Sequence, residues 1–520
     1  MSGVALHWFR KGIRLHDNVP LTKAIESCST LIPIFILDTD FLDPKKVSAN
    51  RLGFLLDSLK CLDEDLQERG SRLIVAKGKP SEVIFSLIEE FKINKLTFER
   101  GTEPFNKDLD DELIGIVNAN DIEVYSNWGH ILFNPDHILA LNNGKTPVTM
   151  NVFLKLASSA PTPLKPIPAP EKIPPPPADF KPKNVEIFIS TPTLSDLKEY
   201  GYDPEAMTTW FKAGEKEGIK IMEDFLKQKQ RVASFEKPKT KPTALLPDTT
   251  ALSPYLSVGS LSVRLFYHKL LEVLKSFKRH SKPPVSLEGQ LYWRELTYLI
   301  GYSTPNFHQM RENPLCYQIP WTEGEAAQEA LKKWEMGQTG YPAVDAAMNQ
   351  LRSDGWMHHL ARHLVACFLT RGDLWISWEL GRDVFDKYLI DADWSINNFS
   401  WHWMSCSAFF YQFFRCYGPV SFFKKTDPNG DYIRKHVPIL AKYPVKYIYE
   451  PWEAPKNVQE AAGCIIGQDY PRPIVEHKTV SQANMGKLKK AYDKNKADRA
   501  KPAKVNAEKL EKPLAKSKLR

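Results

Sequence analysis

Alternating strand and helix patterns fill the first 130 residues. Short apolar runs that end at turn residues predict strands, at residues 4–9, 31–37, 72–78, 95–100 and 122–128. Between them, residues 51–70 and 80–93 carry apolar side chains at i, i+3, i+4 and i+7, as an amphipathic helix does. Strands that are apolar throughout are typical of a parallel sheet covered on both faces. The pattern predicts a doubly wound α/β domain over residues 1–135.

From about residue 215 the apolar period becomes that of helices, and Pro, Gly, Asn and Asp separate the segments. Helices are expected at residues 218–229, 263–277, 287–302, 328–336, 341–355, 357–370 and 375–389. No strand pattern of comparable strength occurs in this half. We therefore expect a large all-α domain over residues 215–485.

Residues 136–214 connect the two domains. Within them, residues 160–182 read APTPLKPIPAPEKIPPPPADFKP. Such proline density excludes a helix or a central strand, and it predicts an extended segment on the surface. We interpret it as a plain spacer in preference to a ligand for an SH3-type domain.

Charge is distributed unevenly along the chain. The net charge is +8, but residues 487–520 hold 13 Lys or Arg against 4 acids, a net +9, so the remainder carries −1. If the body binds nucleic acid, it must use a local basic face. Residues 486–520 are predicted to be a disordered Lys-rich tail that serves solubility, nuclear import or DNA tethering.

Composition excludes several classes of protein. Hydrophobic residues make up 42% and charged residues 25%, as in soluble globular proteins. No apolar run of 18 residues occurs, so we expect no membrane association. Seven cysteines without a CxxC pattern favour a reducing compartment. The α/β half lacks GxGxxG and GxxxxGK[ST], which argues against a standard dinucleotide or P-loop site there.

Tryptophan is concentrated in the helical half. The tryptophans of this region are Trp293, Trp321, Trp356, Trp375, Trp378, Trp394, Trp401 and Trp403. Core filling is one explanation. The other is electron hopping to a redox cofactor, since indoles are oxidisable. Spacing places Trp375 and Trp378 on one helix, and Trp401 and Trp403 around a helix start.

Three further patterns offer polar groups to a ligand. Asp391, Asp393 and Asn397 follow the end of a predicted helix. Their carboxylates could cap the next helix or accept hydrogen bonds from a ring N–H or a sugar hydroxyl. His359 and His363 share one helical face, but the sequence shows neither a following Glu nor a third ligand, so we predict no metal site.

The third pattern is a set of hydroxyl side chains, Thr249, Thr250 and Ser253, which open a predicted helix. They could bind a phosphate together with free backbone N–H groups, or serve only as an N-cap.

Five segments together resemble the cryptochrome/photolyase family. They are HWFRKGIRLHDN (7–18), TTALSPYLSVGSLS (249–262), GQLYWRE (289–295), GWMHHLARHLVACFLTRGDLWISWE (355–379) and DADWSIN (391–397). The likeness extends over nearly the whole chain. It is greatest to the animal-type branch, which contains (6-4) photolyases and vertebrate-like cryptochromes.

The resemblance implies that a U-shaped FAD lies inside the helical domain. Residues that match positions around its phosphates are Lys237, Thr249, Thr250, Leu252 and Ser253. Residues that match the remainder of the FAD site are Gln290, Trp293, Arg294, His359, Arg362, Asp391, Asp393 and Asn397. Of these, Arg362 matches the ion-pair partner of Asp391, and Asn397 matches the residue that faces flavin N5.

The same resemblance implies a reaction. Trp401, Trp378, Trp321 and Trp375 match a proximal-to-distal electron chain that reduces the excited flavin. Residues that match the lesion-binding pocket are Trp293 and Trp403 on its walls and Arg415 and Tyr417 on its rim. His359 and His363 match the proposed catalytic pair that moves a proton in (6-4) repair. The partner would be UV-damaged DNA, with one base flipped into the pocket.

The resemblance leaves other properties open. The α/β domain would hold a second antenna chromophore, of deazaflavin or folate type, or none. We expect a monomer that is located in the nucleus, with the cytoplasm as an additional location.

This sequence departs from the family pattern near the pocket. Phe399 stands where the family has Gly, and His402 where it has Met or Leu. Residues 212–215 (KAGE) and 257–259 (SVG) also differ from the usual motifs. Two functions follow: a light-driven (6-4) photolyase, which we favour, or an animal-type cryptochrome without repair activity. The latter would be a blue-light photoreceptor or circadian transcriptional regulator with protein partners.

Overall fold

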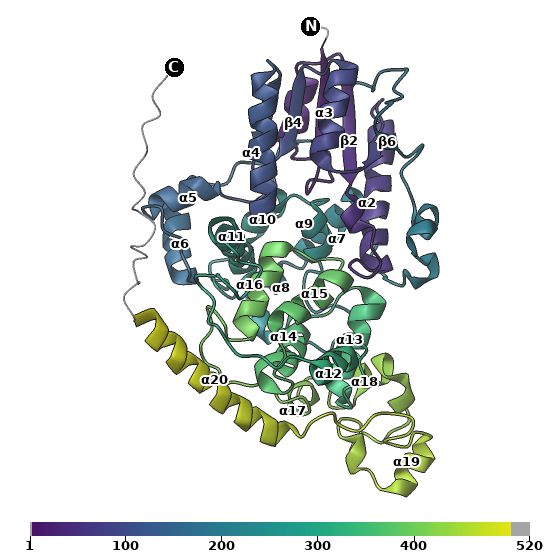
Figure 1. The fold of residues 1–520 in the computed structure, drawn as a ribbon, viewed down its shortest axis with the longest axis vertical. Coiled ribbons are helices and arrows are strands. Elements are labelled where there is room, and N and C mark those ends of the chain that lie inside the picture. The colour runs from purple at the N-terminus through teal and green to yellow at the C-terminus, as the bar shows by residue number, and fades with distance from the viewer. Residues whose placement is uncertain (1–2, 501–520) are drawn as a thin grey trace, which may run out of the picture.

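A computed structural model describes residues 3–500 and confirms the two predicted architectures (Figure 1). The α/β domain contains one sheet in the order β5-β4-β1-β2-β3-β6. Its strands are β1 (Val4–Phe9), β2 (Thr30–Leu37), β3 (Ile74–Lys77), β4 (Lys95–Glu99), β5 (Glu123–Asn127) and β6 (Glu186–Ile187). All pairings are parallel except that of β6 with β3.

Helices cover both faces of this sheet, which explains why its strands are apolar throughout. The covering helices are α1 (Val19–Ile25), α2 (Ala49–Gln67), α3 (Pro80–Phe91) and α4 (Pro104–Ala119). The apolar stripes of α1 and α2 pack with one face of the sheet, and those of α3 and α4 with the other.

The connector is more than the plain spacer that we predicted. It contains α5 (Pro135–Leu141) and α6 (Met150–Ser159) before the Pro-rich segment, which is extended. That segment buries Ile173 in the core of the α/β domain, and the Phe180 ring stacks on Phe91 at 4.6 Å. β6 then joins the edge of the sheet. The connector therefore packs along the α/β domain.

The second domain is helical. Its helices are α7 (Glu215–Lys227), α8 (Lys229–Ser234), α9 (Ser253–Val258), α10 (Val263–Lys275), α11 (Leu287–Ser303), α12 (Glu325–Glu335), α13 (Pro342–Asp354), α14 (His359–Cys367), α15 (Trp378–Tyr388), α16 (Trp394–Met404), α17 (Ser421–Lys424), α18 (Asp431–His436) and α19 (Lys456–Ala462). A π-helical turn, Phe368–Gly372, follows α14.

Two tryptophan placements differ from the prediction. Trp375 precedes α15 with φ +57°, so it does not share a helix with Trp378. Trp401 and Trp403 both lie inside α16.

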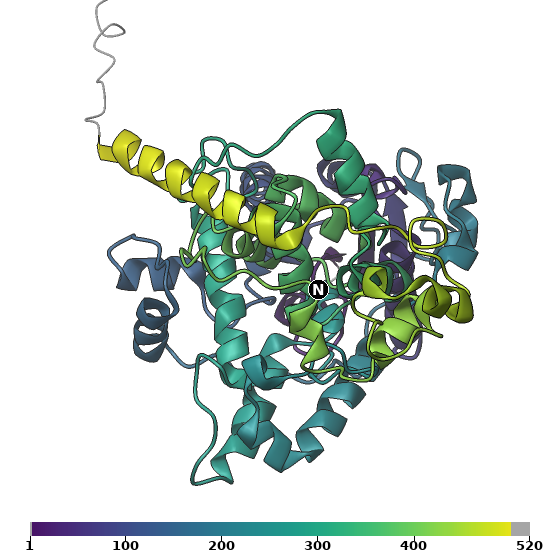
Figure 2. The same cartoon turned by 90° about the horizontal axis from the view of Figure 1, so that it is seen from below.

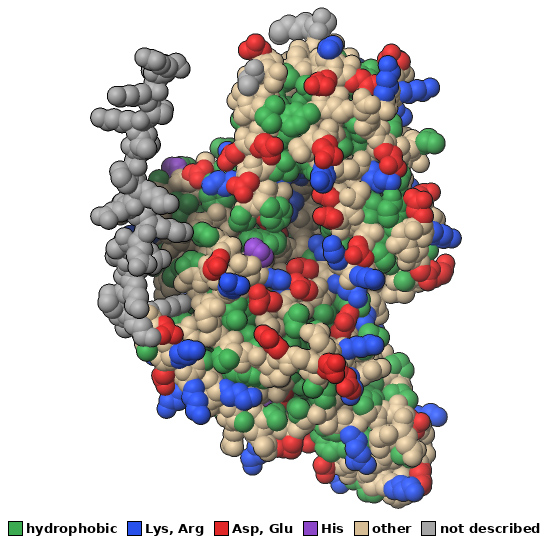
Figure 3. Space-filling view, in the orientation of Figure 1, with side chains coloured by type: hydrophobic (Ala, Val, Ile, Leu, Met, Phe, Trp, Pro, Cys, Tyr) green, Lys and Arg blue, Asp and Glu red, His purple; other side chains and the backbone are tan. Residues whose placement is uncertain are grey.

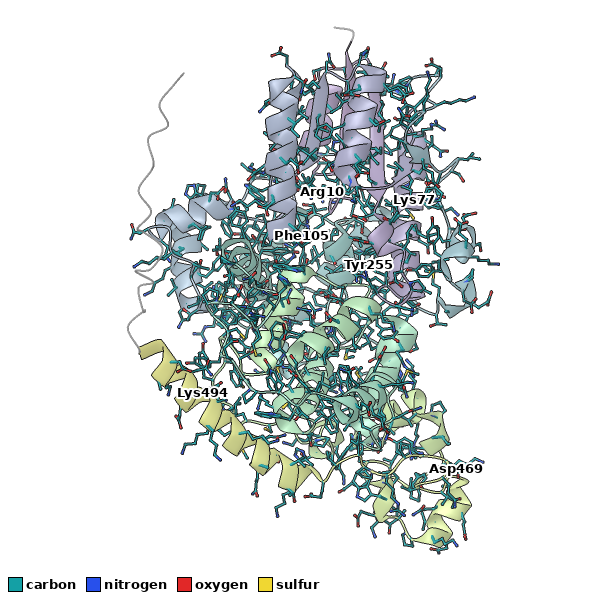
Figure 4. All side chains as sticks on the ribbon, in the orientation of Figure 1. Arg10, Lys77, Phe105, Tyr255, Asp469 and Lys494 are labelled. Atoms are coloured by element: carbon teal, nitrogen blue, oxygen red, sulfur yellow. The ribbon has the colours of Figure 1, made fainter. Side chains whose placement is uncertain are left out.

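The loop after β1 joins the two domains. The Arg14 guanidinium pairs with Glu99 at 2.6 Å and donates to the Gly259 carbonyl, and Asp17 pairs with Arg264 of α10. Gly259 has φ +75°, and a Cβ there would collide with the Lys11 carbonyl. Figure 4 shows Arg10 at the end of the sheet that faces the helical domain. The segment 10–18 therefore fixes the domain junction.

The predicted disordered tail is wrong for residues 486–500. They form part of α20 (His477–Ala500), which lies along the outside of the helical domain and carries Lys494 (Figures 2 and 4). Leu488, Ala491 and Tyr492 are buried in its core. Basic side chains lie along α20 in Figure 3. The remainder of the predicted tail, 501–520, falls outside the described residues.

We expect Tyr492→Ala to lower the free energy of unfolding by about 3 kcal/mol or more, because it empties a buried aromatic site. The Tyr492 hydroxyl donates to the Cys406 carbonyl at 2.5 Å, so Tyr492→Phe should cost about 1 kcal/mol. Denaturant titration measures both changes. The exposed Lys489→Ala on the same helix serves as the control and should stay within about 0.5 kcal/mol. Equal stability of Tyr492→Ala and the control would contradict the packing of α20.

Candidate functional site

Cationic and imidazole side chains gather where α14 meets a 3₁₀ turn at residues 237–239. The turn contributes Lys237, and α14 contributes His359, Arg362 and His363. The His359 and His363 rings lie 5.7 Å apart, as their i, i+4 spacing predicts. Arg362 pairs with Asp391 at 2.8 Å, which agrees with the expected ion pair.

This cluster disfavours further positive charge. Burial lowers the pKa of Lys237 to about 8, and the Arg362 guanidinium adds to the shift. Burial, then Lys237 and Arg362, lowers the pKa of His363 to about 3. The same causes hold the pKa of His359 well below its ordinary value. Both imidazoles are therefore neutral near pH 7. From the sequence we had instead predicted that they donate a proton near neutral pH.

The cluster suits an anionic ligand that also has a hydrogen-bonding ring. Its excess positive charge would be offset by a diphosphate. Asp391 Oδ1 and His359 Nδ1 are buried and have no hydrogen-bond partner among the described residues. These atoms could serve ring or sugar groups of the ligand. The residues present thus fit FAD.

The predicted phosphate-side residues lie at the start of α9. Leu252 is buried at the N-cap, and its N–H donates weakly to Thr250 Oγ1 at 3.4 Å. Ser253 Oγ accepts from Trp356 Nε1 at 3.3 Å. Thr249 is partly exposed beside them. The predicted hydroxyls do open a helix, and their role toward a phosphate remains a prediction.

Asp393 behaves differently from Asp391. Its Oδ1 caps α16 by accepting from the Ile396 N–H at 3.1 Å, and its Oδ2 accepts from the Tyr298 hydroxyl. Lys11 Nζ of the β1 loop lies 3.8 Å away. Of the two predicted carboxylates, Asp391 is the one that has acceptor capacity left for a flavin.

Two residues of α11 that we predicted for the flavin pocket already have protein partners. Arg294 donates to the His130 carbonyl at 2.8 Å, and its guanidinium lies 4.5 Å from the Tyr298 ring centre. Gln290 donates to the Pro284 carbonyl at 3.1 Å. Their roles as the pocket floor remain predictions.

Helix α16 presents Asn397 and Trp401 at i, i+4, on one face. Asn397 Nδ2 donates to Asp386 Oδ1 at 2.6 Å, which fixes the amide. Gly381 of α15 lies against the Trp401 ring, where a Cβ would approach Cη2 to 2.2 Å. A glycine at 381 therefore allows α15 and α16 to approach closely around Trp401.

The four predicted electron-chain tryptophans are all buried in one core cluster. The Trp321 and Trp375 rings are 4.9 Å apart. The indole N–H groups of Trp321, Trp378 and Trp401 are buried without a partner among the described residues. Trp334 also contacts the Trp401 ring, at 6.3 Å. The order of transfer along the chain remains a prediction.

The two tryptophans that we predicted on the walls of the lesion pocket contact each other. Trp293 of α11 and Trp403 of α16 have ring centres 5.7 Å apart at 85°. Phe399 touches both rings, at 6.1 and 6.0 Å, and stacks on Phe409 at 4.5 Å. The phenyl ring that replaces a glycine therefore packs against both walls.

The rim of this region is held by a buried arginine. Arg371 of the π-helical turn donates to the carbonyls of Met404, Phe413 and Arg415 at 2.8–2.9 Å. The side chain of Arg415 is exposed. The Tyr417 hydroxyl lies 3.2 Å from His363 Nδ1, which joins the rim to the histidine pair.

His402 points away from the lesion walls. It is fully buried, its Nε2 lies 2.9 Å from the Phe307 carbonyl, and its ring centre is 4.2 Å from that of Trp378. Burial lowers its pKa to about 4. This departure from the family pattern therefore affects the tryptophan core.

Within residues 3–500, no three His, Cys, Asp or Glu side chains form a group that could hold a metal ion. None of the helices in this range is both long and apolar enough to span a bilayer.

Comparison with known proteins identifies the family. Residues 5–172 match the family model described as DNA photolyase, and residues 286–490 match the FAD binding domain of DNA photolyase. The chain is 45% identical to a (6-4)DNA photolyase of Arabidopsis thaliana, over 95% of this chain and 89% of that protein. The chain belongs to the photolyase/cryptochrome family. Cryptochrome-1 of Rattus norvegicus is equally similar, 45% over 94% of this chain and 82% of the relative.

Solved structures agree with this family assignment. A class III photolyase from Agrobacterium tumefaciens matches with a TM-score of 0.80 and 27% identity, over 95% of this chain and 98% of that one. A cryptochrome from Synechocystis matches with a TM-score of 0.80 and 26% identity, over 94% and 99%. The photolyase/cryptochrome relatives thus include both classes that we weighed, and neither is clearly favoured.

Sequence reasoning missed several supporting residues of this photolyase-like site. They are Lys11, Tyr298, Trp334, Arg371 and Asp386. Asp386 lies eleven residues before Asn397, in the preceding helix, so only helix pairing could have revealed their contact. Lys11 lies in a recognised motif, but its approach to Asp393 depends on domain docking.

The pKa of His402 gives a testable effect of pH on stability. Folding favours the neutral ring, so its contribution is fully present above about pH 6.5 and is lost as the pH falls toward 4. His402→Leu should therefore reduce the slope of unfolding free energy against pH in this range, by up to about 1.4 kcal/mol per unit. Urea titrations at several pH values measure it. The exposed His137→Leu is the control, and identical slopes in both variants would refute the assignment.

Proposed function

We propose that this protein is a light-driven DNA repair enzyme that acts on (6-4) photoproducts. The observation that supports this most is the position of His363. It lies between Tyr417 on the rim and the Lys237–Arg362 group that fits the flavin phosphates. Trp293 and Trp403 would stack on a flipped lesion base. Bound FAD, once reduced and excited by light, supplies the electron that starts repair.

The histidine pair would hold and deliver the proton. Burial first, and then the charges of Lys237 and Arg362, lower the pKa of both imidazoles and keep them neutral. An anion bound at these cations would offset their charge and raise the pKa of His359 and His363. Protonated imidazole could then act as a general acid toward the lesion, with the Tyr417 hydroxyl orienting His363.

The remaining assignments belong to the same proposal. UV-damaged DNA is the substrate, and exposed Arg415 contacts its backbone. Trp401, Trp378, Trp321 and Trp375 carry electrons inward from the surface. A second antenna chromophore of deazaflavin or folate type binds the α/β domain, and the protein acts as a monomer in the nucleus. An archaeal photolyase structure that shares the fold carries two FAD molecules and implies a light-harvesting cofactor in that protein.

The second candidate is an animal-type cryptochrome, which would sense blue light or regulate circadian transcription through protein partners. Phe399 is the observation that favours it. A phenyl ring packed against both Trp293 and Trp403 restricts the space between the walls for a flipped base. The flavin site and the tryptophan chain would serve either function.

Trp401→Phe should slow blue-light reduction of the bound FAD severely, because it removes the first electron donor. Absorbance of the oxidised flavin under continuous light with an external reductant measures the rate. Trp334→Phe is a matched control, since Trp334 is also buried and contacts the Trp401 ring. Undiminished photoreduction in Trp401→Phe, or equal loss in both variants, would contradict the predicted chain.

His363→Ala should leave FAD bound and photoreducible yet lower (6-4) repair by about 10²–10⁴-fold, the usual contribution of general acid catalysis. The assay is light-dependent repair of an oligonucleotide that contains one (6-4) product, with flavin occupancy measured for each variant. His137→Ala is the exposed control.

Parent protein that binds FAD but repairs nothing would favour the cryptochrome. Phe399→Gly then tests the cause, since regained repair would identify the phenyl ring as the block.

A further inference from the structure

A hollow open to solvent lies where α13 packs against α18, in the helical domain. Its volume is about 400 Å³. The residues that line it are Asn349, Arg352, Ser353, Lys435, His436 and Pro438. Two hydrogen bonds fix its walls: Asn349 Nδ2 donates to the His436 carbonyl and the Tyr432 hydroxyl donates to Gln350, each at 2.8 Å. This volume falls within the range of small-molecule sites.

Some hydrogen-bonding groups of the residues that line this hollow have no partner within residues 3–500. The Arg352 guanidinium donates to one oxygen, Asn349 Oδ1 at 2.8 Å, and to the weak acceptor Met336 Sδ at 3.3 Å. Its Nε–H is buried without a partner among the described residues. Nε2 of His436, a side chain that is only 8% exposed, is likewise buried and unpartnered. Such groups are costly to bury unless a ligand completes them.

The charge around the hollow is positive. Lys435 is exposed, and its ammonium has only a 3.4 Å contact to the Leu245 carbonyl. The lining residues include no carboxylate. Asp354 lies next to the hollow and accepts from Gln350 at 3.2 Å and from Ser353 at 3.1 Å. Its negative charge also acts on His436, where it opposes the lowering of the pKa by burial. An entering anion would thus meet two lining cations, Arg352 and Lys435, against this one neighbouring carboxylate.

We propose that this hollow binds a small phosphate-bearing ligand of mononucleotide size. Arg352 would grip the phosphate oxygens through Nε and Nη, as guanidinium groups do. Lys435 would add charge, and Ser353 Oγ and His436 Nε2 would complete the hydrogen bonds. The volume exceeds the need of a bare phosphate ion, so the remainder of the ligand would lie over Pro438 and the His436 ring.

This site is separate from the flavin cluster but connected to it along the chain. Arg352 and Ser353 lie in the last turn of α13, and Gly355 ends that helix. His358 follows as the N-cap of α14, the helix that carries His359 and His363. A ligand at the end of α13 would therefore act on the segment that positions the histidine pair.

Isothermal titration calorimetry of FAD-loaded protein, freed of excess FAD, with adenosine monophosphate tests the proposal. We expect saturable 1:1 binding, no measurable binding of adenosine, and weaker binding of inorganic phosphate. Arg352→Gln should weaken nucleotide binding about tenfold or more, since hydrogen bonds to charged groups are stronger than those between neutral groups. Lys435→Gln should weaken nucleotide binding severalfold. Because Lys435 is exposed, that variant keeps the test valid if Arg352→Gln does not fold.

A control variant localises the binding. Arg279→Gln makes the same charge change at an exposed position outside the hollow. It should leave the nucleotide affinity unchanged.

Four results would overturn the proposal: no saturable binding up to millimolar nucleotide, affinity unchanged in Arg352→Gln and Lys435→Gln, adenosine or inorganic phosphate binding as tightly as the nucleotide, or a phosphoserine peptide binding more tightly. The result does not depend on repair activity, so it is distinct from a failure of the proposed function.

Discussion

Positive charge in a partly buried cluster, only partly balanced by neighbouring acids, is the constraint on which the site depends. Among the described residues, the ion-pair partner of Arg362 is Asp391, whose second oxygen is buried without a donor. A partly buried cation with few partners is costly, and the lowered pKa of Lys237 reflects that cost. Bound FAD would relieve it, because its diphosphate brings the missing negative charge. Cofactor binding and stability of the helical domain are therefore linked.

The same charge sets what the histidine pair can do. Burial and the two neighbouring cations both lower the pKa of these imidazoles, which makes them poor acids near pH 7. An anion placed at the cations would remove the part of the shift that their charge causes. Acid catalysis would thus be available in the loaded site and suppressed in the empty one. The hydrogen bond between His363 and Tyr417 holds the ring in place in both cases.

Periodicity predicted the fold well because each helix buries one face, and the central strands of the sheet are buried on both faces. It also predicted pairs along one helix, such as His359 with His363. It could not predict contacts made by domain docking, such as Lys11 with Asp393. We predicted a disordered tail because of its Lys content, and for residues 486–500 that prediction was wrong. Leu488, Ala491, Tyr492 and Asn495 are all buried at i, i+3, i+4 and i+7, the signal of a packed helix.

Repair and signalling differ here by the shape of the pocket more than by its chemical groups. His359, His363 and Tyr417 lie together, and Phe399 contacts none of them among the ring contacts of the described residues. Phe399 is only 6% exposed, and it stacks on Phe409 while contacting both Trp293 and Trp403. His402 turns instead to Trp378. The two departures on α16 thus contact different tryptophans, Phe399 the predicted walls and His402 the Trp378 ring, and both also contact Phe409. His359, His363 and Tyr417, the groups to which we assign proton transfer in our proposal, lie apart from both departures, and this arrangement supports the proposal of repair.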